Sequence, residues 1–355
     1  MSKIIASAAI RGAHRIVERA ERKYEEALKK WGPNQEVGFP NTAYYLPIIY
    51  AILGVLFLIG MIALPSFRSS RNLFNVLRQA VALGLVSVGQ TLAILVGGID
   101  LSVGSTISLI GVYTTGLMAQ YSSLGAVALI VVAMIAIALM IGLANAFVIT
   151  RLRVAPFIAT MGVGAIIQGF ILLYAKRPGG RIAPGWDFFA EGMIGPVPFP
   201  VIFFLVLVAL AYFFLKRTAV GRHVAATGGS EVIARLSGIQ TRRVTAYAFM
   251  ASAFTAALTG LFLTSRMGAG DPLMGGLNFD RYDLDSVTAV LLGGTRLGGG
   301  KGGVLGTLAG VLLVSLLNNL FNLAGINPYI QWIVKGVIVV SAVAIYASRR
   351  SGETK

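Results

Sequence analysis

SLGAVALIVVAMIAIALMIGLANAFVI, residues 123–149, contains no charged side chain. A helix of about 20 apolar residues crosses the hydrocarbon core of a bilayer, so this stretch alone is long enough to span a membrane. Nine similar stretches lie on either side of it, near residues 45–64, 79–97, 101–119, 155–175, 199–215, 243–265, 284–295, 303–323 and 329–347. We therefore predict an all-α, polytopic membrane protein with about ten transmembrane helices.

The composition supports this class and argues against two others. Hydrophobic residues make up 56% of the 355 residues and charged residues 12%, against roughly 25% charged in an average soluble domain. The net charge of +16 could indicate a nucleic-acid partner, but the basic residues lie in short segments between the apolar stretches. The chain has no cysteine, and its two histidines, His14 and His223, lie far apart. We therefore predict neither a nucleic-acid partner nor a metal site.

The distribution of Lys and Arg predicts the orientation of the chain. With ten crossings and the N-terminus inside, the inner segments carry 21 of these residues and the outer segments 8. Cytoplasmic loops are enriched in Lys and Arg, so this excess places both termini in the cytoplasm. The eighth stretch, 284–295, is too short to cross alone. It crosses only if glycine-rich backbone continues it, or if it is a half-helix packed within protein.

This topology divides the chain into three parts. Residues 1–44 form a cytoplasmic polar tail with an amphipathic helix over residues 14–31, which either binds a partner or the membrane surface or is simply solvated. Residues 45–347 form the transmembrane permease domain, in which residues 216–243 are the longest cytoplasmic loop. Residues 348–355 form a second cytoplasmic tail.

Two glycine-rich segments interrupt the apolar pattern, GGIDLSVG at 97–104 and GGTRLGGGKGG at 293–303. Interrupted spans in the two halves of a transporter point to a translocation pathway, but tight cytoplasmic turns explain them equally well. The second segment fails the phosphate-loop pattern twice, because Thr295 replaces its first glycine and Gly302 follows Lys301 where Ser or Thr is required. We expect no cofactor in this chain and no ATP bound through this segment.

Several polar residues fall within or at the ends of the apolar stretches. Amides both donate and accept hydrogen bonds, so they suit an uncharged, hydroxyl-rich solute; bonds between helices are the alternative. For Asp100 and Ser102 we favour capping of the third span over a functional carboxylate. Lys335, inside the last span, either pairs with an acid such as Asp285 or extends to the outer interface, and we expect the second. The tentative pathway residues are Gln90, Asp100, Ser102, Asn145, Gln168, Asn318, Asn319 and Asn322.

The long cytoplasmic loop contains the signals of a short helix. Ser230 can cap its first turn, Glu231 stands where the helix dipole favours an acid, and Gly238 can end it. Such a helix, protruding between two spans, is either a contact for a partner protein or a simple connection.

These residues together resemble the permease subunits of bacterial ABC importers for monosaccharides of the ribose, galactose and xylose type. The resemblance covers roughly residues 73–346. It rests on NLFNVL at 72–77, GIDLSVG at 98–104, GSE at 229–231 with RLSGI at 235–239, LGGT at 292–295 with GGKG at 299–302, and LNNL at 317–320 followed by Gln331 and Lys335.

The resemblance implies a permease in the bacterial inner membrane, paired with an identical or related permease subunit. It also implies two cytoplasmic ATP-binding subunits, a periplasmic sugar-binding protein, and no enzyme activity in this chain. The ATPase-contacting residues would be Glu231, Ala234, Arg235 and Gly238. Arg296, where a small polar residue is usual, and the long polar tail depart from the family pattern.

Two alternatives remain from the sequence. A related permease would carry nucleosides or branched-chain amino acids. An ion-coupled secondary transporter would need carboxylates within the membrane, and by the sequence only Asp100 qualifies.

Overall fold

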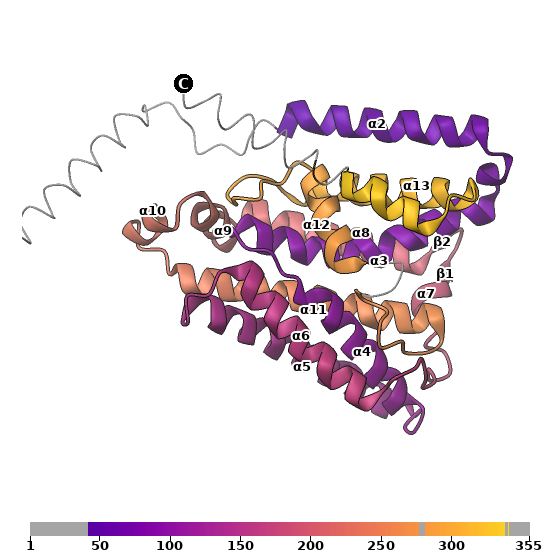
Figure 1. The fold of residues 1–355 in the computed structure, drawn as a ribbon, viewed down its shortest axis with the longest axis horizontal. Coiled ribbons are helices and arrows are strands. Elements are labelled where there is room, and N and C mark those ends of the chain that lie inside the picture. Colours follow the sequence, from indigo (N-terminus) through magenta and orange to yellow (C-terminus); the bar gives the residue numbers. More distant parts are fainter. Residues whose placement is uncertain (1–41, 277–280, 338–339, 341–355) are drawn as a thin grey trace, which may run out of the picture. The chain divides into compact units, whose positions relative to one another are not determined.

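The structure is a computed structural model that describes residues 42–276, 281–337 and 340. The predicted tail helix and the C-terminal tail 348–355 lie outside these residues. Most of these residues are in helices (Figure 1). The strands among the described residues form one hairpin of two antiparallel two-residue strands, which was not predicted from the sequence; Ile194 pairs with Val197 across its turn.

Every predicted apolar stretch coincides with a helix. Nine are α2 (Thr42–Ala63), α3 (Ser70–Leu95), α4 (Ser102–Met118), α5 (Leu124–Thr150), α6 (Pro156–Tyr174), α8 (Phe199–Arg217), α11 (Thr241–Met267), α12 (Tyr282–Leu292) and α13 (Val304–Leu323). Residues 328–337 are the described part of the tenth. The short elements between them are η1 (Pro65–Arg68), α7 (Phe188–Glu191), β1 (Met193–Ile194), β2 (Val197–Pro198), α9 (Ala219–Gly229) and α10 (Glu231–Leu236).

Within the described residues, six helices are long and apolar enough to cross a membrane: α3, α5, α6, α8, α11 and α13. They differ in where they lie. The most apolar windows of α3 and α11 are 83% and 72% buried within the protein, whereas those of α5 and α8 are 17% and 22% buried. Figure 1 shows α11 between α5 and α6 on one side and α3 and α13 on the other. The exposed helices are the more apolar ones, as expected where lipid rather than water surrounds the protein.

The segments that connect the helices meet in two separate groups. In one group, the backbone N–H of Gly300, between α12 and α13, donates to the carbonyl of Leu95 at the end of α3, 2.9 Å away. In the other, Gly179 and Gly270 exchange backbone hydrogen bonds of 2.9 Å, and Arg181 N–H donates to the Thr115 carbonyl. The charge count assigns the first group to the inner side and the second to the outer side. The fold therefore brings together segments that the predicted topology places on the same side.

α12 is preceded by irregular backbone that runs along α4. From Gly270, which is paired with Gly179, this backbone continues to Gly275, whose N–H donates to the hydroxyl of Ser108 at 2.9 Å. α12 itself has 11 residues, about 16 Å or half of the hydrocarbon core. Of the two forms predicted for the eighth stretch, the structure shows the half-helix packed within protein.

Candidate functional site

Both glycine-rich segments begin as turns that end a helix. Gly97 has a φ of 86° and Gly294 a φ of 83°, the left-handed conformation that glycine adopts without strain. The N–H of Gly98 bonds to the carbonyl of Ala93, and the N–H of Thr295 bonds to that of Val290. This is the Schellman pattern of a helix C-terminus. The glycine-rich segments were interpreted either as interrupted spans or as tight turns. The structure shows tight turns, and the two turns contact each other.

Behind the first turn, four predicted pathway residues form one buried polar cluster. The Asp100 carboxylate accepts hydrogen bonds from the N–H and the hydroxyl of Ser102, at 3.0 and 2.6 Å. Asn145 of α5 donates to that hydroxyl at 2.8 Å. With its amide nitrogen turned toward the Asp100 carbonyl, Gln90 of α3 bonds to both backbone groups of Asp100, at 3.1 and 3.2 Å. As predicted, Asp100 accepts from a free N–H of the first turn of α4, although Leu101 holds the cap position. Ser102 does not cap, because its hydroxyl bonds to Asp100 and Asn145. The cluster joins α3, α4 and α5.

Among the described residues, two buried acceptors of this cluster have no hydrogen-bond partner: Oδ2 of Asp100 and Oδ1 of Asn145. The hydroxyl of Ser252, on α11, lies beside the Asp100 carboxylate. Buried polar atoms without partners are uncommon in folded proteins. The cluster is therefore the part of the predicted set whose chemistry best suits a solute that donates hydrogen bonds.

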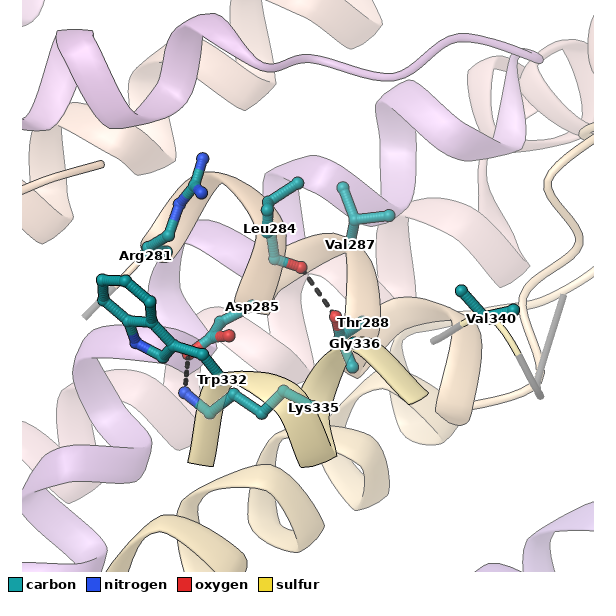
Figure 2. A pocket seen from close by; sticks show the side chains of 9 residues that line it. All are labelled: Arg281, Leu284, Asp285, Val287, Thr288, Trp332, Lys335, Gly336 and Val340. Carbon is teal, nitrogen blue, oxygen red and sulfur yellow. Dashed lines mark hydrogen bonds and ion pairs between the residues drawn. The ribbon is translucent and has the colours of Figure 1, made fainter. Parts of the chain in front are cut away.

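A cavity of about 290 Å³ lies between α12 and the helix over residues 328–337 (Figure 2). At its wall the Lys335 ammonium lies 2.7 Å from Oδ2 of Asp285. Both side chains are largely buried, 17% and 11% exposed. The expectation that Lys335 extends to the outer interface is wrong, because its side chain lies on the face that packs against α12, where the ammonium reaches the Asp285 carboxylate.

A second ion pair lies beside the first. Nη2 of Arg281 is 3.5 Å from Oδ2 of Asp283, and both acids lie in the first turn of α12, where the helix dipole favours negative charge. From the sequence, only Asp100 was expected to be a carboxylate within the membrane; the structure adds Asp283 and Asp285 as acids whose side chains are only 16% and 11% exposed. The signal was present in the sequence: two acids directly before an apolar run, and an unexplained lysine in a later span.

The cavity has a mixed wall. Apolar side chains, three ion-paired residues and a threonine surround it, and Figure 2 shows them on two facing helices. Binding sites for small polar molecules combine these features, with apolar walls and a few oriented polar groups. The lining residues are Arg281, Leu284, Asp285, Val287, Thr288, Trp332, Lys335, Gly336 and Val340.

Gln168 and Asn318 lie outside the buried cluster. Gln168 donates to the carbonyl of Pro272 at 3.0 Å and so holds the irregular backbone before α12. Asn318 of α13 is buried, and its Oδ1 has no partner. Gln168 therefore holds the backbone before α12 in place, whereas Asn318 has a buried acceptor without a partner among the described residues.

The other two predicted amides bridge separate parts of the chain. Asn319 and Asn72 exchange hydrogen bonds of 2.8 and 3.1 Å, which join α13 to the start of α3. Asn322 accepts from Nε2 of Gln331 at 3.0 Å. These contacts correspond to the interhelical alternative in the sequence analysis.

The short helix predicted in the long loop is present as α10. The Ser230 hydroxyl accepts from the N–H of Ile233, and Gly238 follows the helix with a φ of 81°. Glu231 pairs with Arg235 and accepts from the hydroxyl of Thr241 at 3.2 Å. The predicted cap, the acid in the first turn and the glycine stop are all confirmed.

The burial of Ala234 argues against the role proposed for it as an ATPase contact on α10. Ala234 is 2% exposed and faces its own chain. Three apolar neighbours, which the sequence analysis did not single out, are instead open: Val232, Ile233 and Leu236 are 69%, 47% and 71% exposed. Exposed apolar residues gathered on one short helix are typical of a protein contact.

Comparisons with known proteins give consistent results. A family model described as the permease component of a branched-chain amino acid transport system matches residues 72–343. A second model, the N-terminal domain of the carbon monoxide dehydrogenase alpha subunit, matches only residues 21–58. No solved structure matches the chain significantly.

Three curated proteins illustrate the similarity. The ribose import permease protein of Haemophilus influenzae is 34% identical over 302 residues, 82% of this chain and 91% of its own length. The corresponding ribose protein of Bacillus subtilis is 36% identical over 296 residues, 82% and 90% of the two chains. The D-allose transport system permease protein of Escherichia coli is 33% identical over 310 residues, 86% and 90%.

Proposed function

Because this chain belongs to the family of branched-chain amino acid transport system permease components, we propose that it forms the translocation pathway of an ABC importer for a monosaccharide. The observation that carries this proposal is the similarity to ribose and allose permeases, which extends over more than four-fifths of both chains. In this proposal the chain catalyses no reaction itself. It binds no cofactor, and partner subunits bind and hydrolyse the ATP.

We place the chain in the bacterial inner membrane with about ten crossings and both termini in the cytoplasm. The excess of Lys and Arg in the inner segments supports this orientation. The convergence of the three segments around Leu95, Gly228 and Gly300 is consistent with the same topology, which assigns all three to one side of the membrane.

The proposed assembly has three kinds of partner: a second permease subunit, two cytoplasmic ATP-binding subunits and a periplasmic sugar-binding protein. α10 is the proposed contact for the ATP-binding subunit. Its exposed Val232, Ile233 and Leu236 supply apolar area, and the Glu231–Arg235 pair beside them supplies polar contacts.

Two features are proposed to contact the sugar. The free acceptors of Asp100 and Asn145 can receive hydrogen bonds from sugar hydroxyls. The cavity beside Asp285 and Lys335 offers both donors and acceptors next to the aromatic ring of Trp332. Apolar faces of sugar rings pack on aromatic side chains, so this wall suits a monosaccharide.

Transport by the complete assembly tests the function. The chain is reconstituted in proteoliposomes with the ATP-binding and sugar-binding proteins encoded beside its gene, and uptake of labelled ribose, allose, galactose and leucine is measured with and without ATP. We expect ATP-dependent uptake of one or more of the sugars. Uptake of leucine alone would favour the amino-acid alternative that the family description suggests. Sugar uptake that needs no ATP and collapses with an uncoupler would indicate a secondary transporter.

The α10 contact is tested with one variant and one control. Leu236→Asp places a charge in the proposed apolar contact, and we expect co-purification with the ATP-binding subunit to fall about tenfold. Val197→Asp, on β2 at the predicted outer side and 39% exposed, carries the same change and should leave co-purification intact. Equal recovery with both variants would place the ATPase contact elsewhere.

A further inference from the structure

Three chain segments that are distant in sequence meet at one point: the end of α3, the end of α9 and the turn between α12 and α13. The N–H of Gly300 donates to the carbonyl of Leu95, which is 1% exposed, at 2.9 Å. Gly228, in the last turn of α9, lies against the same carbonyl. We call Leu95, Gly228, Gly299 and Gly300 the glycine junction.

Backbone meets backbone at this junction, with no room for side chains. A Cβ atom added to Gly228 would lie 1.8 Å from the carbonyl oxygen of Leu95 and 2.6 Å from the nitrogen of Gly300. A Cβ added to Gly299 would lie 2.8 Å from the nitrogen of Gly97 and 2.9 Å from the Cα of Gly228. Side chains adjust to a displacement by changing rotamer, but a contact made of backbone alone cannot adjust in this way. The junction therefore transmits displacement rather than absorbing it.

The position of the junction links the proposed ATPase contact to the buried polar cluster. Ser230 is both the C-cap of α9 and the N-cap of α10, so Gly228 lies only three residues before the first residue of α10. On the other side, Leu95 ends α3 just before the turn that carries Asp100. α10 is exposed, whereas Asp100 is fully buried. At the junction, the segment that leads into α10 therefore contacts the segment that leads to Asp100.

We propose that the glycine junction makes α9–α10, the inner end of α3 and the α12–α13 turn move as one rigid unit, so that displacement of α10 reaches the pathway. This inference rests on the proposed function, because it assumes an ATP-driven partner that displaces α10. It predicts that enlarging the junction uncouples transport from ATP hydrolysis. It also predicts that a covalent cross-link between the same segments leaves transport intact.

The first test compares two neighbouring glycines in the reconstituted complex. Gly228→Ala introduces a Cβ into the junction, whereas a Cβ at Gly229 meets nothing within 4 Å. We expect Gly228→Ala to lower the sugar transported per ATP hydrolysed by about tenfold, within the usual range of coupling between sites. Co-purification with the ATP-binding subunit should stay unchanged. Gly229→Ala should retain the full ratio.

The second test does not depend on how Gly228→Ala folds. A Cβ at Gly300 would lie 2.7 Å from the Cα of Gly229, and the next residue, Lys301, is exposed. The chain has no cysteine, so Gly229→Cys with Lys301→Cys introduces the only two thiols. Joining them with a short, reductant-cleavable bifunctional reagent should leave at least half of the uptake, before and after cleavage. The two single-cysteine variants, treated in the same way, serve as controls.

Each contrary outcome has a distinct meaning. Normal coupling in Gly228→Ala, or loss of the ATP-binding subunit from that variant, would overturn the inference, the second because it would show a docking role. Uptake abolished by the cross-link and restored by reductant would also overturn it, since the segments would then have to separate during transport. Failure of the unsubstituted complex to take up any sugar with ATP would instead refute the proposed function and, with it, this inference.

Discussion

At the start of α4, the Asp100 carboxylate is fully buried and accepts hydrogen bonds from the N–H and hydroxyl of Ser102, two residues away. At the start of α12, the Asp285 carboxylate is also buried but lies 2.7 Å from the ammonium of Lys335, 50 residues away. Neutral donors hold the first acid, and an opposite charge on another helix holds the second.

The carboxylate of Asp100 is held by contacts close in sequence, whereas that of Asp285 is held by a contact between distant helices. The Asp100 contacts are made within one turn and cap a helix, so they form wherever that helix forms. The Asp285 contact exists only when α12 and the helix over residues 328–337 are packed together. The pair therefore reports on that packing, and it lines the cavity between the two helices. The three predictions below test this contrast, from the largest expected effect to the smallest.

Lys335→Leu should have the largest effect. It leaves Asp285 buried without its cation, which typically costs about 3–5 kcal/mol. We expect a strongly lowered unfolding temperature of the detergent-solubilised protein. Replacing both partners, Lys335→Leu with Asp285→Leu, should recover most of the stability, because the buried carboxylate is then removed together with its ammonium partner. A double variant as unstable as the single one would show that the pair does not hold these helices together.

Ser102→Ala should have an intermediate effect. It removes a hydroxyl that donates to Asp100 and accepts from Asn145, so two buried groups each lose a partner, at about 1–3 kcal/mol in total. The change is read from chemical unfolding curves. Ser123→Ala is the matched control, because Ser123 precedes α5 without making a side-chain cap bond. Equal curves for the two variants would contradict the cluster.

Asp100→Asn should have the smallest effect. Asparagine keeps the Oδ1 acceptor and caps helices as well as aspartate does, so we expect a stability change below about 1 kcal/mol. Uptake in the reconstituted assay should nevertheless fall, because an amide nitrogen then replaces Oδ2, the acceptor proposed to receive a sugar hydroxyl. Normal stability with unchanged uptake would show that this acceptor is not needed for transport.

The capped helix α10 shows what could be predicted from local sequence. Ser230, Glu231 and Gly238 were identified from residue type and spacing, and the structure confirms each role. The burial of Ala234 could not be predicted in the same way. It depends on which face of α10 packs against the rest of the chain, and six residues carry too little periodicity to indicate that face.

Lys335 shows the corresponding limit for the candidate site. The sequence left its partner open between Asp285 and the outer interface, and we expected the wrong one. An ion pair across 50 residues depends on the packing of two helices, which hydropathy does not encode. Asp283 was missed for a related reason, because α12 starts as a half-helix inside the protein rather than at its surface.

The sequence by itself determined the helical class and the approximate positions of the apolar helices in the part of the chain that the structure describes. In a bilayer, backbone groups must be satisfied within each segment, so apolar length alone specifies a helix. Only the tertiary structure decided which helices lie inside, which carboxylate has a cation, and that Leu95, Gly228 and Gly300 meet at one point. These features arise from close approach between distant segments. The residue type of a glycine or a lysine does not indicate which distant residue it will contact.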